Sequence, residues 1–230
     1  MDLVILAGGS GTRISAISQG TPKSLLPIGN LLFMDKILSN VNRYDINHIY
    51  LSLHYKPEAF NKYLKNCDYN VKITPIIEPV PLGTGGAIHY IIKNTSISDP
   101  FFVINGDTLS NTNLDEIKYR FTKTDYDAMI GISNIENSSR YGKVEFEKDE
   151  LVQFNEKKRA SAGWINNGHY ILKKDLFKNF SGNFSIEYDL FPSIVEKKKL
   201  GVFKVVNDQF IDMGIPDDYK KLCEKYKNID

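Results

Sequence analysis

The chain has 230 residues, of which 42% are hydrophobic and 25% charged, a composition typical of a single globular domain. Its 29 basic and 28 acidic residues give a formal net charge of +1, which argues against nucleic acid or an acidic membrane surface as a partner. No stretch is apolar for long enough to cross a bilayer, and the amino terminus lacks the basic segment of a signal peptide. Because the two cysteines match no metal or redox spacing either, we expect a cytoplasmic protein.

The hydrophobic pattern alternates between strands and helices along the chain. Residues 1–6 predict a buried strand, apolar residues recur at helical spacing between Phe33 and Tyr44, and 46–53 predict a second strand, which together make a β-α-β unit. Further strands are expected at 71–77, 101–105, 127–133, 143–147, 151–154 and 164–172, and helices at 87–93, 114–121, 188–197 and 216–226. We therefore expect an α/β fold, in which a mostly parallel central sheet flanked by helices carries a small mixed or antiparallel extension.

The first strand ends in three glycines within residues 8–11, followed by Arg13 and, after Pro22, by Lys23. Glycines let backbone N–H groups approach phosphate oxygens, and the two basic side chains add positive charge at the sheet edge where ligands of α/β proteins bind. The spacing excludes a dinucleotide fingerprint, because Ile14 stands where the third glycine is needed, and a Walker loop, because Pro22 precedes Lys23. A tight turn between strand and helix would explain the glycines but not Arg13, Pro22 and Lys23.

A series of motifs continues along the whole chain: LAGGSGTR at 6–13, TPKSLLP at 21–27, LGTGGA at 82–87, VINGD at 103–107, FNEK at 154–157, NNGHY at 166–170 and DMGIPDDY at 212–219. In this order they resemble the sugar-1-phosphate nucleotidyltransferases, the enzymes that make nucleotide sugars. The resemblance implies a Rossmann-like nucleotidyltransferase fold in a single domain of residues 1–230, with a nucleotide-binding half at about 1–110 and a sugar-binding half at about 111–230.

The reaction implied by the resemblance joins a nucleoside monophosphate, taken from a nucleoside triphosphate, to a sugar 1-phosphate and releases pyrophosphate. The attacking phosphate oxygen is already ionised, so positioning and charge neutralisation suffice without a general base. The alternative from another class is a non-catalytic nucleotide-sugar sensor. A sensor has no need of Arg13, Lys23, Asp107 and Asp212 together. Assembly into a homo-oligomer is compatible with the resemblance.

Two aspartates follow apolar runs and are the candidate ligands of Mg²⁺. Asp107 comes directly after the expected strand 101–105, and Asp212 follows Phe210 and Ile211. Two carboxylates that converge on triphosphate oxygens suit this ion, although each aspartate could instead cap a turn or the last helix. By resemblance, Arg13 and Lys23 are catalytic, and both aspartates bind the metal. The expected nucleotide-binding residues are Leu6, Ala7, Gly8, Gly9, Ser10, Gly11, Thr12, Glu78, Gly83, Thr84, Asn105 and Gly106.

The second half of the chain carries the residues expected to bind the sugar phosphate. Lys157 resembles the family lysine that holds the incoming phosphate, and a neighbouring carboxylate and an amide supply the acceptors and donors that a polyol needs. The whole set comprises Gly142, Glu156, Lys157, Asn166, Gly168 and Glu187. A surface charge pair is the simpler alternative for Glu156 and Lys157. Ser24, Asn167 and His169 depart from the broader family pattern and bear on the choice of sugar.

The choice of base rests on Glu78, which stands five positions before Gly83, where thymidylyl- and uridylyltransferases of the family often have glutamine. A carboxylate can accept two hydrogen bonds side by side and so matches the N1–H and N2–H₂ donors of guanine, whereas uracil and thymine present one donor between acceptors. GTP is therefore favoured, unless Glu78 simply faces solvent at the end of its strand. Residues 81–87 resemble those of the bacterial guanylyltransferases for D-glycero-D-manno-heptose 1-phosphate, which favours this sugar. The runner-up is a uridylyl- or cytidylyltransferase for another hexose 1-phosphate.

Overall fold

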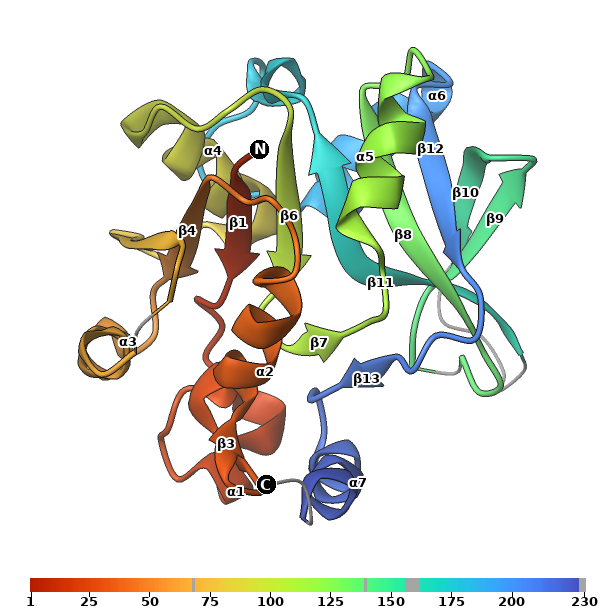
Figure 1. The fold of residues 1–230 in the computed structure, drawn as a ribbon. Coiled ribbons are helices and arrows are strands. Elements are labelled where there is room, and N and C mark those ends of the chain that lie inside the picture. Colours follow the sequence, from red (N-terminus) through yellow and green to blue (C-terminus); the bar gives the residue numbers. More distant parts are fainter. Residues whose placement is uncertain (68, 139, 156–161, 228–230) are drawn as a thin grey trace.

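The structure is a computed structural model that describes residues 1–67, 69–138, 140–155 and 162–227 (Figure 1). Its strands are β1 (Leu3–Leu6), β2 (Pro27–Ile28), β3 (Leu31–Leu32), β4 (His48–Leu53), β5 (Lys72–Ile77), β6 (Phe101–Asn105), β7 (Thr108–Leu109), β8 (Ala128–Ile135), β9 (Lys143–Glu147), β10 (Glu150–Asn155), β11 (Gly163–Leu172), β12 (Leu200–Val205) and β13 (Ile211–Asp212). Its α-helices are α1 (Ser15–Ser18), α2 (Phe33–Val41), α3 (Pro57–Lys65), α4 (Gly83–Asn94), α5 (Leu114–Thr122), α6 (Phe191–Glu196) and α7 (Pro216–Tyr226).

Within the described residues, nine strands form one sheet in the order β5-β4-β1-β6-β11-β8-β12-β10-β9. The strands from β5 to β6 are parallel to one another, whereas β11 runs antiparallel to both of its neighbours β6 and β8. At the other end β10 pairs antiparallel with β12 and with β9. The expected α/β class with flanking helices is confirmed, and the antiparallel extension proves to be a continuation of the same sheet.

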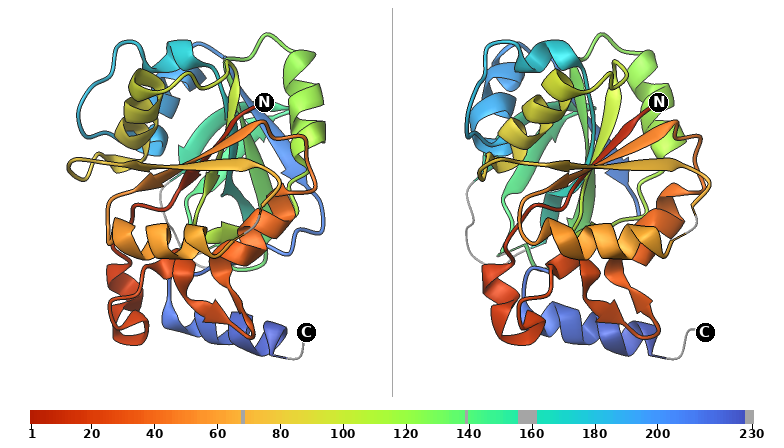
Figure 2. Two further views of the ribbon diagram at one scale, coloured as in Figure 1. Left: turned by 60° about the vertical axis from the view of Figure 1, so that its left-hand side comes forward. Right: turned by 90° about the vertical axis from the view of Figure 1, so that its left-hand side faces the viewer.

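Helices cover both faces of the sheet, as Figure 2 shows. Side chains alternate along β1, so that Leu3 and Ile5 join the core under α2, α3 and α5 while Val4 joins the core under α4 and α6. All three side chains are fully buried, and burial of such a side chain contributes about 1.5–3 kcal/mol. A continuous apolar run such as residues 3–6 is therefore what a strand covered on both faces requires.

Local sequence sets where several helices begin. The backbone N–H of Leu32 donates to the Asp35 carboxylate at 2.7 Å, which caps α2. Pro57 opens α3, a helix that the sequence analysis did not predict although this proline and the acidic Glu58 mark its first turn. The helix expected at 87–93 begins four residues earlier, at Gly83.

Two further expectations need correction in the second half of the chain. The strand β12 was not predicted, because Gly201 and Lys204 interrupt its apolar run, so it shows neither the continuous pattern of β1 nor a strict alternation. The helix expected at 188–197 is a π-helical turn, Ile186–Leu190, followed by the short helix α6. Among the described residues, no helix has both the length and the apolar composition to cross a membrane.

Candidate active site

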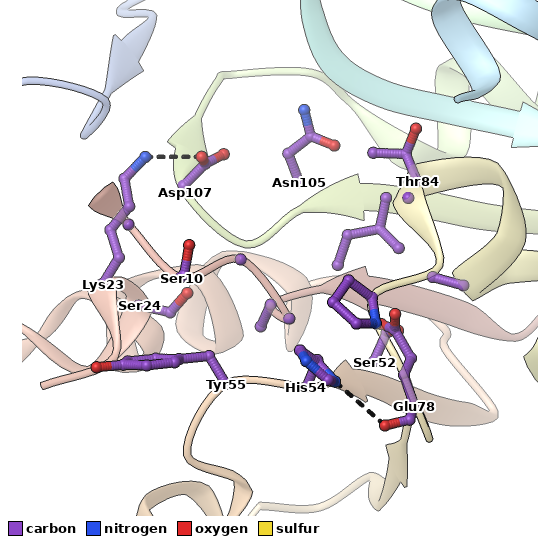
Figure 3. Close-up of a pocket in the computed structure, with 18 of the residues that line it drawn as sticks. Ser10, Lys23, Ser24, Ser52, His54, Tyr55, Glu78, Thr84, Asn105 and Asp107 are labelled. Atoms are coloured by element: carbon purple, nitrogen blue, oxygen red, sulfur yellow. Dashed lines mark hydrogen bonds and ion pairs between the residues drawn. The ribbon is translucent and has the colours of Figure 1, made fainter. Parts of the chain in front are cut away.

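A cleft of about 630 Å³ opens at the carboxyl ends of three neighbouring parallel strands (Figure 3). Leu6 at the end of β1 is in register with Ser52 on β4 and with Asn105 on β6, so the loops that follow these strands emerge at one edge of the sheet. The sequence-predicted residues that line this cleft are Leu6, Ala7, Gly8, Gly9, Ser10, Gly11, Thr12, Arg13, Lys23, Glu78, Gly83, Thr84, Asn105 and Asp107.

The glycine loop crosses the cleft between β1 and the short 3₁₀ turn Thr12–Ile14. Gly11 adopts a left-handed conformation with φ of +62°, which glycine reaches without steric cost. A Cβ atom at Gly8 would lie 2.9 Å from Oε1 of Glu78 and 3.2 Å from the backbone nitrogen of His54, whereas one at Gly9 would have nothing within 4 Å. Gly8 therefore permits the loop to pass close to Glu78, and Gly9 leaves open space toward a ligand.

The glycines at the start of α4 have a different use. Gly83 has φ of +71°, and the backbone N–H groups of Gly85 and Gly86 donate to the carbonyl oxygen of Phe184 at 2.9 and 3.2 Å. A Cβ at Gly85 would lie 2.3 Å from the Phe184 ring. These two glycines let α4 pack against the segment before the π-helical turn, whereas Gly83 and Thr84 line the cleft.

Lys23 and Asp107 meet at one end of the cleft, and Asp212 lies on the neighbouring strand without being among the residues that line the cleft. The ammonium nitrogen of Lys23 lies 2.7 Å from Oδ2 of Asp107, and both residues are among the cleft-lining residues. The strand β13 pairs with β7, which places Asp212 opposite Thr108, and the N–H of Met213 donates to the carbonyl of Asp107 at 3.0 Å. The pairing thus brings Asp107 and Asp212, which are far apart in the sequence, onto neighbouring stretches of backbone.

Burial raises the pKa of Asp212 above its usual value, and the negative charge of Asp107 raises it further, while Lys23 and the Tyr141 hydroxyl oppose the shift. Two like charges that repel in a partly buried site are the arrangement that a bound divalent cation stabilises, so this donor set fits Mg²⁺. Asp212 does not cap the last helix, because Ile215 occupies the N-cap of α7. Its Oδ1 accepts instead from the N–H of Gly214 at 2.7 Å, and Gly214 lines the cleft.

At the other end of the cleft lies Glu78 (Figure 3). Only 7% of this residue is exposed, so the interpretation that it faces solvent was wrong. Its Oε1 accepts from the Ser52 hydroxyl at 2.8 Å, and its Oε2 accepts from the N–H of Leu82 at 3.2 Å. An ionised carboxylate has about four acceptor positions, so these two bonds orient the group and still leave each oxygen able to accept another.

Asn105 and Gly106 differ in position although they are neighbours. The Oδ1 atom of Asn105 is buried without a hydrogen-bond partner within the described part of the chain, and Asn105 lines the cleft. An unpaired buried carbonyl costs free energy unless a ligand donates to it. Gly106, which was expected to bind the nucleotide, is not among the residues that line the cleft. Its N–H donates to the carbonyl of Leu6, and its carbonyl accepts from the Ser24 hydroxyl at 2.6 Å.

The expected sugar residues Asn166 and Glu187 form, together with Tyr170, one hydrogen-bonded wall beside the cleft, although neither they nor Gly168 are among the residues that line it. Asn166 donates to the Tyr170 hydroxyl at 2.9 Å, and this hydroxyl donates to Glu187 at 3.1 Å. Glu187 also accepts at 3.0 Å from Thr84, which reaches into the cleft. The wall is therefore connected to the nucleotide end of the site by direct contacts.

Gly168 and its neighbours on β11 explain how that wall approaches the cleft. Gly168 has φ of +79°, and a Cβ there would lie 2.7 Å from Nδ2 of Asn105. The register of β11 against β8 shifts between Asn166 and Tyr170, which marks a bulge at this point. Gly142 directly precedes β9 and is not among the residues that line the cleft. Glu156 and Lys157 lie outside the described residues.

Four residues with polar side chains that line the cleft were not assigned to it by the sequence analysis: Ser24, noted there only as a family departure, and Ser52, His54 and Tyr55. The last three stand at and just after the end of β4, so their position at the carboxyl edge of a parallel strand was a usable signal. His54 holds the backbone of Glu78 through a contact of 3.2 Å between its Nδ1 and the Glu78 carbonyl oxygen.

Comparison with known proteins gives a consistent result. A family model described as nucleotidyl transferase matches residues 3–229. The chain is 33% identical over 220 residues to a D-glycero-alpha-D-manno-heptose 1-phosphate guanylyltransferase of Campylobacter jejuni, covering 95% of this chain and 97% of that one. It is 35% identical over 223 residues to the protein of the same description from Aneurinibacillus thermoaerophilus, covering 96% of each.

A solved structure, HddC from Yersinia pseudotuberculosis complexed with GMP-PN, superposes on this chain with a TM-score of 0.83. The two chains are 35% identical, and the match covers 98% of this chain and 99% of the other. The similarity therefore extends over both the parallel and the antiparallel parts of the sheet.

Proposed function

This chain belongs to the nucleotidyl transferase family, and we propose that it transfers GMP from GTP to D-glycero-α-D-manno-heptose 1-phosphate, with release of pyrophosphate. The observation that carries the proposal is the cleft itself. A buried carboxylate, Glu78, lies at one end, and Lys23 with Asp107 lies at the other, with the glycine loop between them. The similarity to two heptose 1-phosphate guanylyltransferases supports the choice of both substrates.

Each part of GTP has a matching group in the cleft. The free acceptor positions of Glu78 suit the N1–H and N2–H₂ groups of guanine. The open side of Gly9 leaves room for the phosphates, and Arg13 and Lys23 provide the positive charge that balances them. The buried oxygen of Asn105, which lacks a partner within the described residues, can accept from a hydroxyl of either substrate.

The chemistry is one displacement at phosphorus. An ionised phosphate oxygen of the sugar 1-phosphate forms a bond to the α-phosphorus of GTP, and the bond from that phosphorus to the bridging oxygen breaks, so that its electron pair leaves with pyrophosphate. Lys23 stabilises negative charge near the reacting phosphates, and Arg13 stabilises the departing group. Asp107 and Asp212 would hold Mg²⁺, which when bound neutralises phosphate charge and orients the oxygens.

The sugar would lie along the wall formed by Asn166, Tyr170 and Glu187, whose carboxylate and amide can exchange hydrogen bonds with a polyol. Lys157, by resemblance, would bind the sugar phosphate. The GDP-heptose formed would serve as a cytoplasmic donor for capsule or other surface polysaccharide.

Pyrophosphate release tests the proposal directly. The protein would be assayed with GTP, UTP, CTP and dTTP, each combined with heptose, mannose, glucose and N-acetylglucosamine 1-phosphates. We expect the highest kcat/KM for GTP with the heptose phosphate. An Asp107→Asn variant is assayed in parallel, and loss of pyrophosphate release in this variant would show that the activity belongs to this site. Preference for UTP or CTP would favour the runner-up function, and nucleotide binding without pyrophosphate release for any pair would favour a sensor.

A further inference from the structure

Asp208 lies in the segment that joins β12 to β13, outside the residues that line the cleft, and its carboxylate accepts three hydrogen bonds. Oδ1 accepts from the backbone N–H of Asn111 at 2.7 Å. Oδ2 accepts from the hydroxyl of Ser110 at 2.6 Å and from the hydroxyl of Ser133 on β8. One side chain thus ties together the segment after β7, the segment before β13 and the central sheet. We call these four residues the Asp208 clamp.

The buried side-chain amide of Asn167 contacts the hydroxyl groups of the clamp. Asn167 on β11 has no exposed surface, and its Nδ2 lies 3.0 to 3.1 Å from the hydroxyl oxygens of Ser110, Thr112 and Ser133. Because Ser110 and Ser133 donate to Asp208, they are free to accept from Asn167, so the directions of these bonds agree. A network satisfied in this way holds its members in one arrangement. Asn167, a departure from the broader family pattern, is therefore used inside the protein and not toward the sugar.

The clamp matters for the active site because the ladder beside it is short. β7 and β13 share two residue pairs, Ile211 with Leu109 and Asp212 with Thr108. An isolated two-stranded pair is marginally stable at best, and this one is only two residues long. Since the strands are antiparallel, residues just after β7 lie opposite residues just before β13, which is where Asp208 makes its bonds.

We propose that Asp208 is a positioning residue: by holding the β7–β13 ladder, it sets the separation of the Asp107 and Asp212 carboxylates and hence the affinity of the site for a divalent cation. This inference rests on the proposed function in one respect, the assignment of the two aspartates as metal ligands. Asp208 itself makes its hydrogen bonds to Ser110, Asn111 and Ser133 and is not placed among the groups that touch substrate.

The test compares wild type with Asp208→Ala and Asp208→Asn. Binding of Mn²⁺ alone is measured by the electron paramagnetic resonance signal of the free ion, and the Mg²⁺ concentration for half-maximal pyrophosphate release is measured separately. We expect Asp208→Ala to weaken Mn²⁺ binding at least about tenfold and to raise the Mg²⁺ requirement to a similar extent, while KM for GTP at saturating Mg²⁺ stays within about twofold. Asp208→Asn, which keeps an acceptor for the N–H of Asn111, should fall between.

Asp149→Ala is the matched control, because Asp149 is a turn carboxylate between β9 and β10 that pairs with Lys204 at 3.2 Å, and within the described residues it makes no hydrogen bond or ion pair to β7 or β13. It should leave Mn²⁺ affinity unchanged. Unchanged Mn²⁺ affinity in folded Asp208→Ala would overturn the proposal, as would a loss of stability with no change in the Mg²⁺ requirement. If Asp208→Ala does not fold, Asp208→Asn and Ser133→Ala decide the question by the same criterion.

The Mn²⁺ measurement also separates this inference from the proposed function. A wild-type protein that binds Mn²⁺ but makes no GDP-heptose would contradict the substrate assignment. The clamp proposal would then be decided by the Mn²⁺ titration of Asp208→Ala alone. A wild-type protein that binds no Mn²⁺, with or without GTP, would overturn the clamp proposal together with the assignment of the metal ligands.

Discussion

Replacing Glu78 by glutamine tests how the base is recognised while changing one atom. In the native site Ser52 donates to one carboxylate oxygen and the N–H of Leu82 donates to the other. The amide introduced by Glu78→Gln has to place its oxygen toward the N–H of Leu82, because two donors would otherwise face each other. Its NH₂ group then lies beside the Ser52 hydroxyl, which can rotate and accept. We therefore expect the fold to tolerate the change and the loss of free energy to appear in the recognition of guanine.

The magnitude follows from the hydrogen bonds lost. Guanine would meet one acceptor and one donor where it requires two acceptors, so one of its N–H groups would be left facing an N–H group in a buried site. A buried donor without a partner costs about 1–3 kcal/mol. This corresponds to a loss of about 5- to 150-fold in the preference for GTP over UTP, expressed as the ratio of their kcat/KM values.

The assay measures both nucleotides with the same sugar 1-phosphate by pyrophosphate release. Glu116→Gln, which removes an exposed carboxylate paired with Arg120 on α5, is the matched control and should keep the native ratio. An unchanged GTP:UTP ratio in Glu78→Gln would refute the reasoning and place base recognition elsewhere in the cleft, as would equal use of GTP and UTP by the wild-type protein.

Three further predictions concern the metal site, the packing and the pH dependence. Asp107→Asn should keep the fold but lower turnover at least about a hundredfold, because metal placement supplies several kcal/mol of transition-state stabilisation; pyrophosphate release near the native rate would remove Asp107 from the metal site. Gly29 has φ of +64°, and a Cβ there would lie 2.3 Å from the carbonyl oxygen of Tyr226, so Gly29→Ala should lower the free energy of unfolding by about 1–3 kcal/mol, and an unchanged denaturation midpoint would contradict this. Burial lowers the pKa of His169 from 6.5 to about 4, so the unfolded chain binds more protons than the folded protein within this window. The free energy of unfolding should therefore fall by about 3 kcal/mol from this group as the pH drops from 6.5 to 4, and denaturant titrations of His169→Gln should lack that part of the fall. Equal pH dependence in the two proteins would show that His169 does not contribute.

Part of the site could be predicted because it depends on local sequence. A short apolar strand followed by glycines places its loop at the carboxyl edge of a parallel sheet in any α/β fold, so residues 8–13 and Asp107 could be assigned to one edge from the strands that precede them. The order of the motifs along the chain indicated the family, which the comparisons confirm.

Other features depended on contacts between distant segments. The sequence offered no means of showing that Glu78 is buried against Ser52, that the N–H groups of Gly85 and Gly86 are used by Phe184, or that Asp208 contacts Ser110. The strand β12 was missed because Gly201 and Lys204 interrupt its apolar run, and its place in the sheet is set by pairing with the distant strand β8.

The sequence by itself therefore determined the α/β class, the glycine loop and the family, because these follow from the period of apolar residues and from motifs read in order. The resemblance had named Asp107 and Asp212 as a pair, but only the tertiary structure shows the contact that brings their segments together. Asp107 and Asp212 come together through a two-residue antiparallel ladder whose register depends on the packing around it. A side chain's partners in a ladder are set by which strand lies beside it, and that choice is made by the whole core, not by the residues near it in sequence.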